Sequence, residues 1–163
     1  IVTHKRVELL RHSLEQVVNQ THPVDWVIVV DNGAESEVEQ LLSDLARKDR
    51  GVYLPSHTNL GGAGGFAYGF LHALALGADA IWCADDDGRP ESHETLAELY
   101  RVAEERNLHE VSPIVAAIDD PNRLAFPIRQ GLTWMRNTDE LEGEFLPGYA
   151  SLFLFLYTSD AAD

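Results

Sequence analysis

Short apolar runs alternate with helical segments over most of this chain, and that order is the strongest constraint on its fold. Apolar residues at helical spacing predict a helix at 7–19, and a continuous β-branched run at 26–30 is typical of a strand covered on both faces. Further strands are predicted at 1–3, 52–54 and 80–84, and further helices after Ser36, after Gly65 and over 92–106. Such repeats build a parallel sheet with helices on both faces. We therefore predict an α/β fold with a mainly parallel, twisted sheet.

The ends of the elements carry weaker signals. Ser36, with Glu39 three residues later, predicts a capping box at the start of the second helix. A fifth strand is predicted at 111–117, at an edge because Pro113 interrupts it. Beyond Asp119 only short strand-like pieces are predicted, at 124–128, 132–135 and 145–146.

The composition indicates one globular domain and excludes several kinds of partner. A chain of 163 residues, 45% hydrophobic and 24% charged, suits a single domain. Its net charge of -15 argues against nucleic acid or an anionic membrane surface as the main partner, although a local anion site stays open. Cys83 is the single cysteine, so an internal disulfide and a Cys-rich zinc site are excluded, and a reducing cytoplasm fits. No run approaches the roughly 18 apolar residues of a membrane span.

Both ends of the chain read as incomplete. The sequence begins without Met, at an Ile-Val-Thr run that resembles the last part of a strand. Residues 156–163 resemble a translated sequencing adapter, so we expect a non-native tail there. The predicted domain therefore covers residues 1–153.

Three consecutive carboxylates, Asp85, Asp86 and Asp87, follow the apolar run at 80–84 directly. Adjacent like charges raise each other's proton affinity, so such a cluster needs solvent, cations or a metal. On an extended backbone Asp85 and Asp87 point to one face and Asp86 to the other. We therefore expect Asp85 and Asp87 to be able to share one cation.

Polar residues follow the other predicted strands as well. Thr3, Asp31 and Asn59 each come after an apolar run, as the aspartates do, and ligands of parallel α/β sheets bind outside the carboxyl ends of the strands. Glycines such as Gly61 and Gly62, at the start of a helix, let backbone N–H groups approach an anion closely. A nucleotide diphosphate with a divalent cation suits this set, and Asp31 would accept a hydrogen bond from the base.

Each motif also has a simpler reading. Asp31-Asn32-Gly33 is a common turn sequence, and the glycines suit a close contact between helix and sheet. Residues 62–67 match a dinucleotide fingerprint, so an NAD-dependent oxidoreductase is an alternative. Against it, the glycines do not follow a strand at once, and a ribose needs one carboxylate rather than three. A noncatalytic nucleotide-binding module is a third possibility.

Taken together, four motifs resemble the inverting family 2 glycosyltransferases of GT-A fold. They are Val-Thr-His-Lys-Arg at 2–6, Val-Val-Asp-Asn-Gly at 29–33, Asn-Leu-Gly-Gly-Ala-Gly-Gly at 59–65 and the Asp triplet at 85–87. Residues 59–88, together with 110–113, 119–121, 123–127 and 131–132, are also similar to the galactofuranosyltransferases that begin the galactan of the actinobacterial cell wall.

This resemblance implies a UDP-galactofuranose donor, Mn²⁺ or Mg²⁺, and a rhamnosyl-N-acetylglucosaminyl diphospho-polyprenol acceptor at the cytoplasmic membrane face. The protein would then be cytoplasmic and peripheral to that membrane, and residues 1–153 would form the nucleotide-sugar-binding domain. The roles implied by the resemblance fall on a few residues: uracil on Thr3 and Asp31; the nucleotide-sugar near Asn59, Gly61, Gly62 and Asp86; ribose or metal on Asp85; metal on Asp87. The base that deprotonates the acceptor lies well after the Asp triplet in that family, so we assign none and expect it beyond this sequence.

Overall fold

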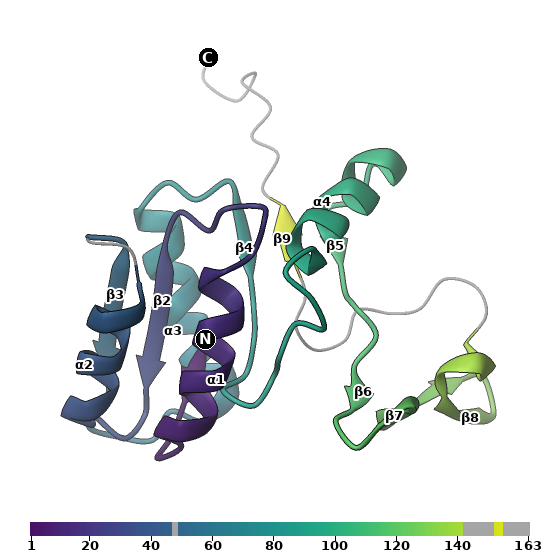
Figure 1. The fold of residues 1–163 in the computed structure, drawn as a ribbon, viewed down its shortest axis with the longest axis horizontal. Helices are drawn as coiled ribbons and strands as arrows, with labels where there is room; N and C mark the ends of the chain where they lie inside the picture. The colour runs from purple at the N-terminus through teal and green to yellow at the C-terminus, as the bar shows by residue number, and fades with distance from the viewer. Residues whose placement is uncertain (47–48, 142–151, 155–163) are drawn as a thin grey trace.

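The computed structural model describes residues 1–46, 49–141 and 152–154 (Figure 1). The strand-like piece predicted at 145–146 and the tail predicted at 156–163 lie outside these residues. Within the described part of the chain, no helix has the length and apolar character needed to span a membrane.

The amino-terminal half forms the predicted parallel sheet. Its strands are β1 (Val2–Thr3), β2 (Val27–Asp31) and β3 (Gly51–Pro55), in the order β1-β2-β3. Val30 of β2 lies opposite Val2 on one side and Leu54 on the other. All three strands therefore end at the same edge of the sheet, as predicted.

Helices cover both faces of this sheet (Figure 1). The helices are α1 (Val7–Val18), α2 (Ser36–Leu45) and α3 (Gly61–Ala75). Leu10, Leu14 and Val38 of the first two helices pack with Val29, because alternate residues of β2 face that side. Val30 faces the other side, in a cluster against which Phe66 of α3 packs. The β-branched run at 26–30 is therefore covered on both faces, as its sequence predicts.

The fourth predicted strand is shorter than expected and pairs outside the parallel ladder. It is β4 (Ala80–Trp82), which pairs antiparallel with β9 (Leu152–Leu154). The other neighbour of β9 is β5 (Glu110–Val111), and α4 (Thr95–Arg106) packs Leu96 and Leu99 against Leu152. A parallel bridge between Val2 and Asp85 connects this part to β1. The α/β class is confirmed, while the sheet is parallel only through β1–β3 and this bridge.

The strand predicted at 111–117 is split, because Pro113 lies between two short strands that pair elsewhere. One is β5, and the other is β6 (Ala116–Ala117), which begins a third sheet with β7 (Asp120–Gln130) and β8 (Thr133–Asn137). A 3-10 turn, η1 (Thr138–Glu140), follows. The pieces predicted at 124–128 and 132–135 are thus the two arms of one hairpin.

The predicted capping box at the second helix is wrong. Ser36 is the first residue of α2, and Glu35 holds the N-cap position without a side-chain cap. A capping box does form at η1, between Asn137 and Glu140.

Candidate functional site

The strand ends meet at one pocket, as the sequence predicts. The pocket has a volume of about 430 Å³ and lies at the carboxyl ends of β1 and β2, beside the start of α3. Its lining residues are Val2, Thr3, His4, Arg6, Asn32, Asn59, Gly61, Gly62, Asp85, Asp86 and Asp87. Six of the seven residues predicted to bind a nucleotide-sugar are therefore brought together, and Asp31 is the exception.

Asp86 is the buried member of the acidic triplet, with 4% of its surface exposed. Thr3 donates a hydrogen bond from Oγ1 to Asp86 Oδ2 at 2.8 Å, and Arg6 donates from Nη1 to Asp86 Oδ1 at 3.2 Å. A buried carboxylate is stable only when it is paired and hydrogen-bonded, and Asp86 has both kinds of partner. Asp86 thus ties the loop after β4 to the end of β1.

Arg6 lines the pocket although the sequence predicted no role for it, as do His4 and Asn32. The same Nη1 atom reaches Asp87 Oδ2 at 3.0 Å, so one guanidinium bridges Asp86 and Asp87. Arg6 is the last residue of the motif at 2–6 that resembles family 2. Nothing in the sequence predicted its contact with the aspartates, which lie about 80 residues later. The bridge offsets the repulsion between two of the three neighbouring carboxylates.

Asp85 and Asp87 are the residues that could hold a cation. Burial, reinforced by the charges of Asp87 and Asp86, raises the pKa of Asp85 above its ordinary value. No group of three or more His, Cys, Asp or Glu side chains suited to a metal occurs among the described residues. Mg²⁺ characteristically takes one or two protein carboxylates and completes its shell with water and substrate phosphates. The pair therefore fits a cation that is bound together with a diphosphate.

Asp31 lies just behind the pocket and is fully buried. Its Oδ1 accepts from the Gly33 N–H at 2.7 Å, and its Oδ2 accepts from the Glu35 N–H at 2.6 Å and the Tyr53 hydroxyl at 3.0 Å. Burial and this hydrogen bond to Asp31 raise the pKa of Tyr53 well above its usual value. Because its partners belong to the protein, Asp31 acts here as a turn-forming residue, and its contact with a base stays a prediction.

Asn32 faces the pocket in place of Asp31 and holds the glycine segment. Its Oδ1 accepts from the Leu60 N–H at 3.1 Å, and its Nδ2 donates to the Gly61 carbonyl at 3.3 Å. Asn59 Oδ1 accepts from the Gly61 N–H at 2.8 Å, and the φ of Gly61 is +67°. Asn32, which was predicted only as part of a common turn, therefore joins the end of β2 to the start of α3.

The close contact between helix and sheet predicted for the glycines is present at Gly65, whereas the approach of an anion to Gly61 and Gly62 stays a prediction. A Cβ added at Gly61 or Gly62 would meet nothing within 4 Å, so these residues leave open space at the pocket. A Cβ added at Gly65 would lie 2.6 Å from Val2 Cγ1. Gly61 and Gly62 thus leave the start of α3 accessible to a ligand, whereas Gly65 permits close packing of α3 on β1.

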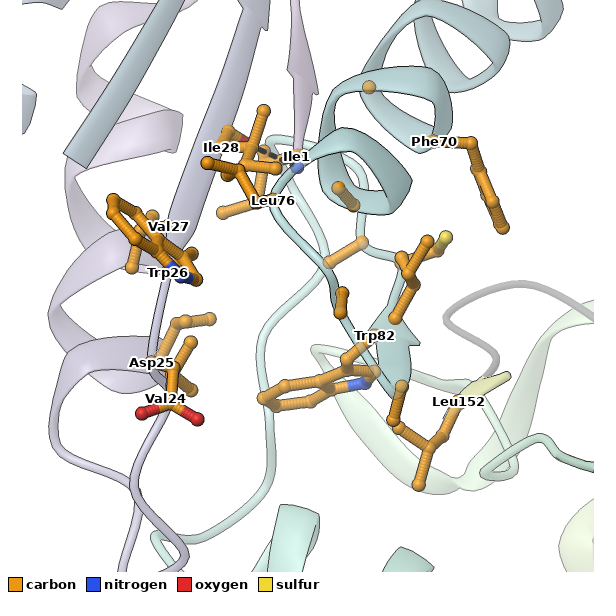
Figure 2. Close-up of a pocket in the computed structure, with 18 of the residues that line it drawn as sticks. Ile1, Val24, Asp25, Trp26, Val27, Ile28, Phe70, Leu76, Trp82 and Leu152 are labelled. Carbon is orange, nitrogen blue, oxygen red and sulfur yellow. Dashed lines mark hydrogen bonds between the residues drawn. The ribbon is translucent and has the colours of Figure 1, made fainter. Parts of the chain in front are cut away.

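A second cavity, of about 310 Å³, lies between β2, α3 and β4 (Figure 2). Trp26, Ile28, Leu76 and Trp82 are among its lining residues. Its polar lining residues do not include the Asp triplet, and apart from Val2 it shares no lining residue with the first pocket. The convergence of carboxylates and glycines therefore identifies the first pocket as the candidate site.

Comparison with known proteins gives similar sequences over the whole chain. The chain is 51% identical over 171 residues to "Galactofuranosyltransferase GlfT1" of Mycolicibacterium smegmatis, covering 100% of this chain and 56% of that protein. It is 50% identical over 159 residues to the protein of the same name in Mycobacterium tuberculosis strain H37Rv, covering 94% of this chain and 52% of that protein. The chain thus spans about half the length of the curated relatives it matches.

Two solved structures share the fold. One is a mannosyltransferase, PcManGT from Pyrobaculum calidifontis, in complex with GDP-Man and Mn²⁺; it is 19% identical, with a TM-score of 0.57 over 73% of this chain and 35% of that one. The other is S. aureus TarS 1-349, which is 15% identical, with a TM-score of 0.61 over 94% of this chain and 45% of that one. The family described as "Glycosyl transferase family 2" matches residues 1–157. This chain, an α/β domain with its strand ends gathered at one acidic pocket, belongs to glycosyl transferase family 2.

Proposed function

We propose that this chain is the donor-binding part of a galactofuranosyltransferase that uses UDP-galactofuranose. The observation that carries the proposal is the meeting of four separate segments, the ends of β1 and β2, the glycine segment and the Asp triplet, at one pocket. Relatives about 50% identical to this chain are named galactofuranosyltransferases, and we take galactofuranose as the transferred sugar from those names. The chain belongs to family 2, so we prefer this function to that of an NAD-dependent oxidoreductase. In this proposal the glycines and the Asp triplet both serve one nucleotide-sugar site.

Each part of the pocket has a task in this proposal. The open backbone at Gly61 and Gly62 approaches the diphosphate, and Asn32 orients that backbone. Asp85 and Asp87 hold Mn²⁺ or Mg²⁺, which when bound supplies positive charge beside the leaving diphosphate. Thr3 borders the nucleotide end of the pocket through its position at the end of β1. Asp86 and Arg6 keep the triplet in place.

We propose that the transfer inverts the configuration at the anomeric carbon of the sugar. The proposed acceptor is a lipid-linked glycan, rhamnosyl-N-acetylglucosaminyl diphospho-polyprenol, at the cytoplasmic membrane face. Inversion needs a carboxylate or similar base that takes the proton of the acceptor hydroxyl. The described acidic residues of the pocket are committed to Arg6, Thr3 or the cation, so we assign the base to none of them. The donor and acceptor roles are therefore tested separately.

Donor binding is tested by calorimetry of UDP with this chain, in Mn²⁺ and in EDTA. We expect UDP affinity to depend on the metal and to fall at least tenfold, about 1.4 kcal/mol, in Asp87→Ala. Glu37→Ala is the matched control, since Glu37 is an exposed carboxylate on α2. Equal UDP affinity with and without Mn²⁺ would refute the metal role of Asp85 and Asp87.

Catalysis is tested with a protein that spans the full length of the relatives, by following galactofuranose transfer to a polyprenyl-diphosphate glycan. Transfer that disappears in Asp87→Ala would support the enzyme proposal. Metal-dependent UDP binding without any transfer would instead support a noncatalytic nucleotide-binding module.

A further inference from the structure

The β7–β8 hairpin exposes large apolar side chains at its tip. Gly131 and Leu132 connect the two strands, and the φ of Gly131 is +61°. Leu132 is 92% exposed and Trp134, two residues later, is 55% exposed. In Figure 1 this hairpin lies at the far side of the molecule from β1–β3, so it is well separated from the candidate site.

The two faces of the hairpin differ in chemistry. Met135 lies opposite Ile128 and is 4% exposed, so this face packs inward. Trp134 lies opposite Arg129, whose guanidinium carbon is 6.0 Å from the centre of the indole ring. Arg136 shares that face, because alternate residues of a strand point the same way. The outer face therefore combines two arginines with a tryptophan.

The charge of the hairpin is opposite to that of the whole chain. Residues 121–138 contain three arginines and no Asp or Glu, in a chain with a net charge of -15. The acidic residues Asp119, Asp139 and Glu140 flank this segment in the sequence, and Asp120 is the first residue of β7. Arg123 lies near the start of β7 and pairs with Asp119. Arg129 lies toward the tip of the hairpin, where it donates to the Gly131 carbonyl at 2.9 Å. Glu140 Oε2 accepts from the Arg136 N–H at 2.7 Å, so a carboxylate lies near that arginine, and the positive charge at the tip, beside Leu132 and Trp134, is mainly that of Arg129.

We propose that the tip of this hairpin docks on the surface of an anionic lipid bilayer. Leu132 and Trp134 enter the interfacial layer, where tryptophan is enriched in membrane proteins. Arg129 and Arg136 lie against the anionic headgroups, which attract basic side chains close to the surface. The complementary charge selects this partner, since the repulsion expected from the net charge of -15 is locally reversed. This inference rests on the proposed function, because it names the surface that meets the membrane at which transfer is proposed to occur; its test uses no nucleotide, so its failure is distinguishable from failure of the donor pocket.

The test is sedimentation of this chain with phosphatidylglycerol-containing vesicles and with pure phosphatidylcholine vesicles, without nucleotide. We expect binding to the anionic vesicles only, with loss in 0.5 M salt. The variant Arg129→Gln should weaken it about fivefold, the effect of one basic residue near such a surface, and Arg136→Gln should weaken it less, because Glu140 lies beside Arg136. Arg106→Gln, an exposed arginine on α4, is the charge control and should bind normally.

The apolar contribution is tested with Leu132→Ser, against Leu71→Ser as control, because Leu71 is also strongly exposed (66%) but lies on α3. A Trp134→Phe variant should lose the lipid-induced blue shift of the fluorescence, since Trp26 and Trp82 lie elsewhere. Circular dichroism and UDP calorimetry show whether each variant is folded. Unchanged vesicle binding in Leu132→Ser, or equal binding to both kinds of vesicle, would overturn the proposal, whatever the outcome for UDP.

Discussion

Replacing Gly65 with alanine tests the close contact between α3 and β1. The new Cβ would lie 2.6 Å from Val2 Cγ1 and 3.1 Å from Val2 Cγ2, so turning the valine side chain cannot clear both contacts. Overpacking of a core costs up to about 3 kcal/mol. Alanine regains about 1 kcal/mol of helix propensity over glycine. We therefore expect a net loss of about 2 kcal/mol in the free energy of unfolding.

The measurement is urea unfolding followed by circular dichroism, with thermal unfolding as a second method. For a chain of this size, a loss of about 2 kcal/mol corresponds to a decrease of about 4–8 °C in the melting temperature. Gly62→Ala is the matched control for stability, because a Cβ there meets nothing within 4 Å. It should leave the midpoint unchanged or raise it slightly.

The Gly65→Ala substitution should also weaken ligand binding in the pocket. Val2 is bridged to Asp85, so a shift of β1 away from α3 displaces one carboxylate of the proposed cation site. We expect weaker metal-dependent UDP binding in Gly65→Ala even under conditions where the chain is folded. A Gly65→Ala protein as stable as the control would refute the packing argument, because the valine would then have room to move.

Three further substitutions or measurements follow from single contacts. Tyr53→Phe removes the hydroxyl that donates to Asp31 Oδ2 at 3.0 Å and should cost about 1–3 kcal/mol in urea unfolding; an unchanged midpoint would contradict this. The pKa of Asp85 is raised in the folded state, so ionised Asp85 costs stability once the pH rises above about 4. Asp85→Asn should therefore raise the melting temperature more at pH 7 than at pH 3.5, and equal shifts at both pH values would refute the linkage. Burial raises the pKa of the Cys83 thiol to about 11, so at pH 8 iodoacetamide should alkylate the folded chain more than about 100-fold slower than the urea-unfolded chain, with equal rates as the contrary result.

Local pattern was sufficient for β1 to β3, for the four helices and for the edge at which the pocket forms. An apolar run such as 26–30, β-branched at 27–30, is typical of a buried strand, and polar residues that end such runs are placed at one edge by parallel pairing. Thr3, Asn59 and the Asp triplet could therefore be assigned to one pocket before any contact was known. The glycines were identified too, although their two roles were not separable.

Pairing between distant segments was not predictable in this way. β4 pairs with β9, about 70 residues later, and a strand of three residues carries no signal for its partner. The contacts of the side chains were not predictable either. Arg6 bridges Asp86 and Asp87, which lie 80 and 81 residues later in the sequence. The Asp31 carboxylate accepts hydrogen bonds from its own turn and from Tyr53. Which polar group faces the ligand depends on which partners folding brings within hydrogen-bonding distance. The sequence thus determined where the site would form, and only the tertiary structure decided which of its carboxylates are free to act there, because burial and pairing are properties of the assembled fold.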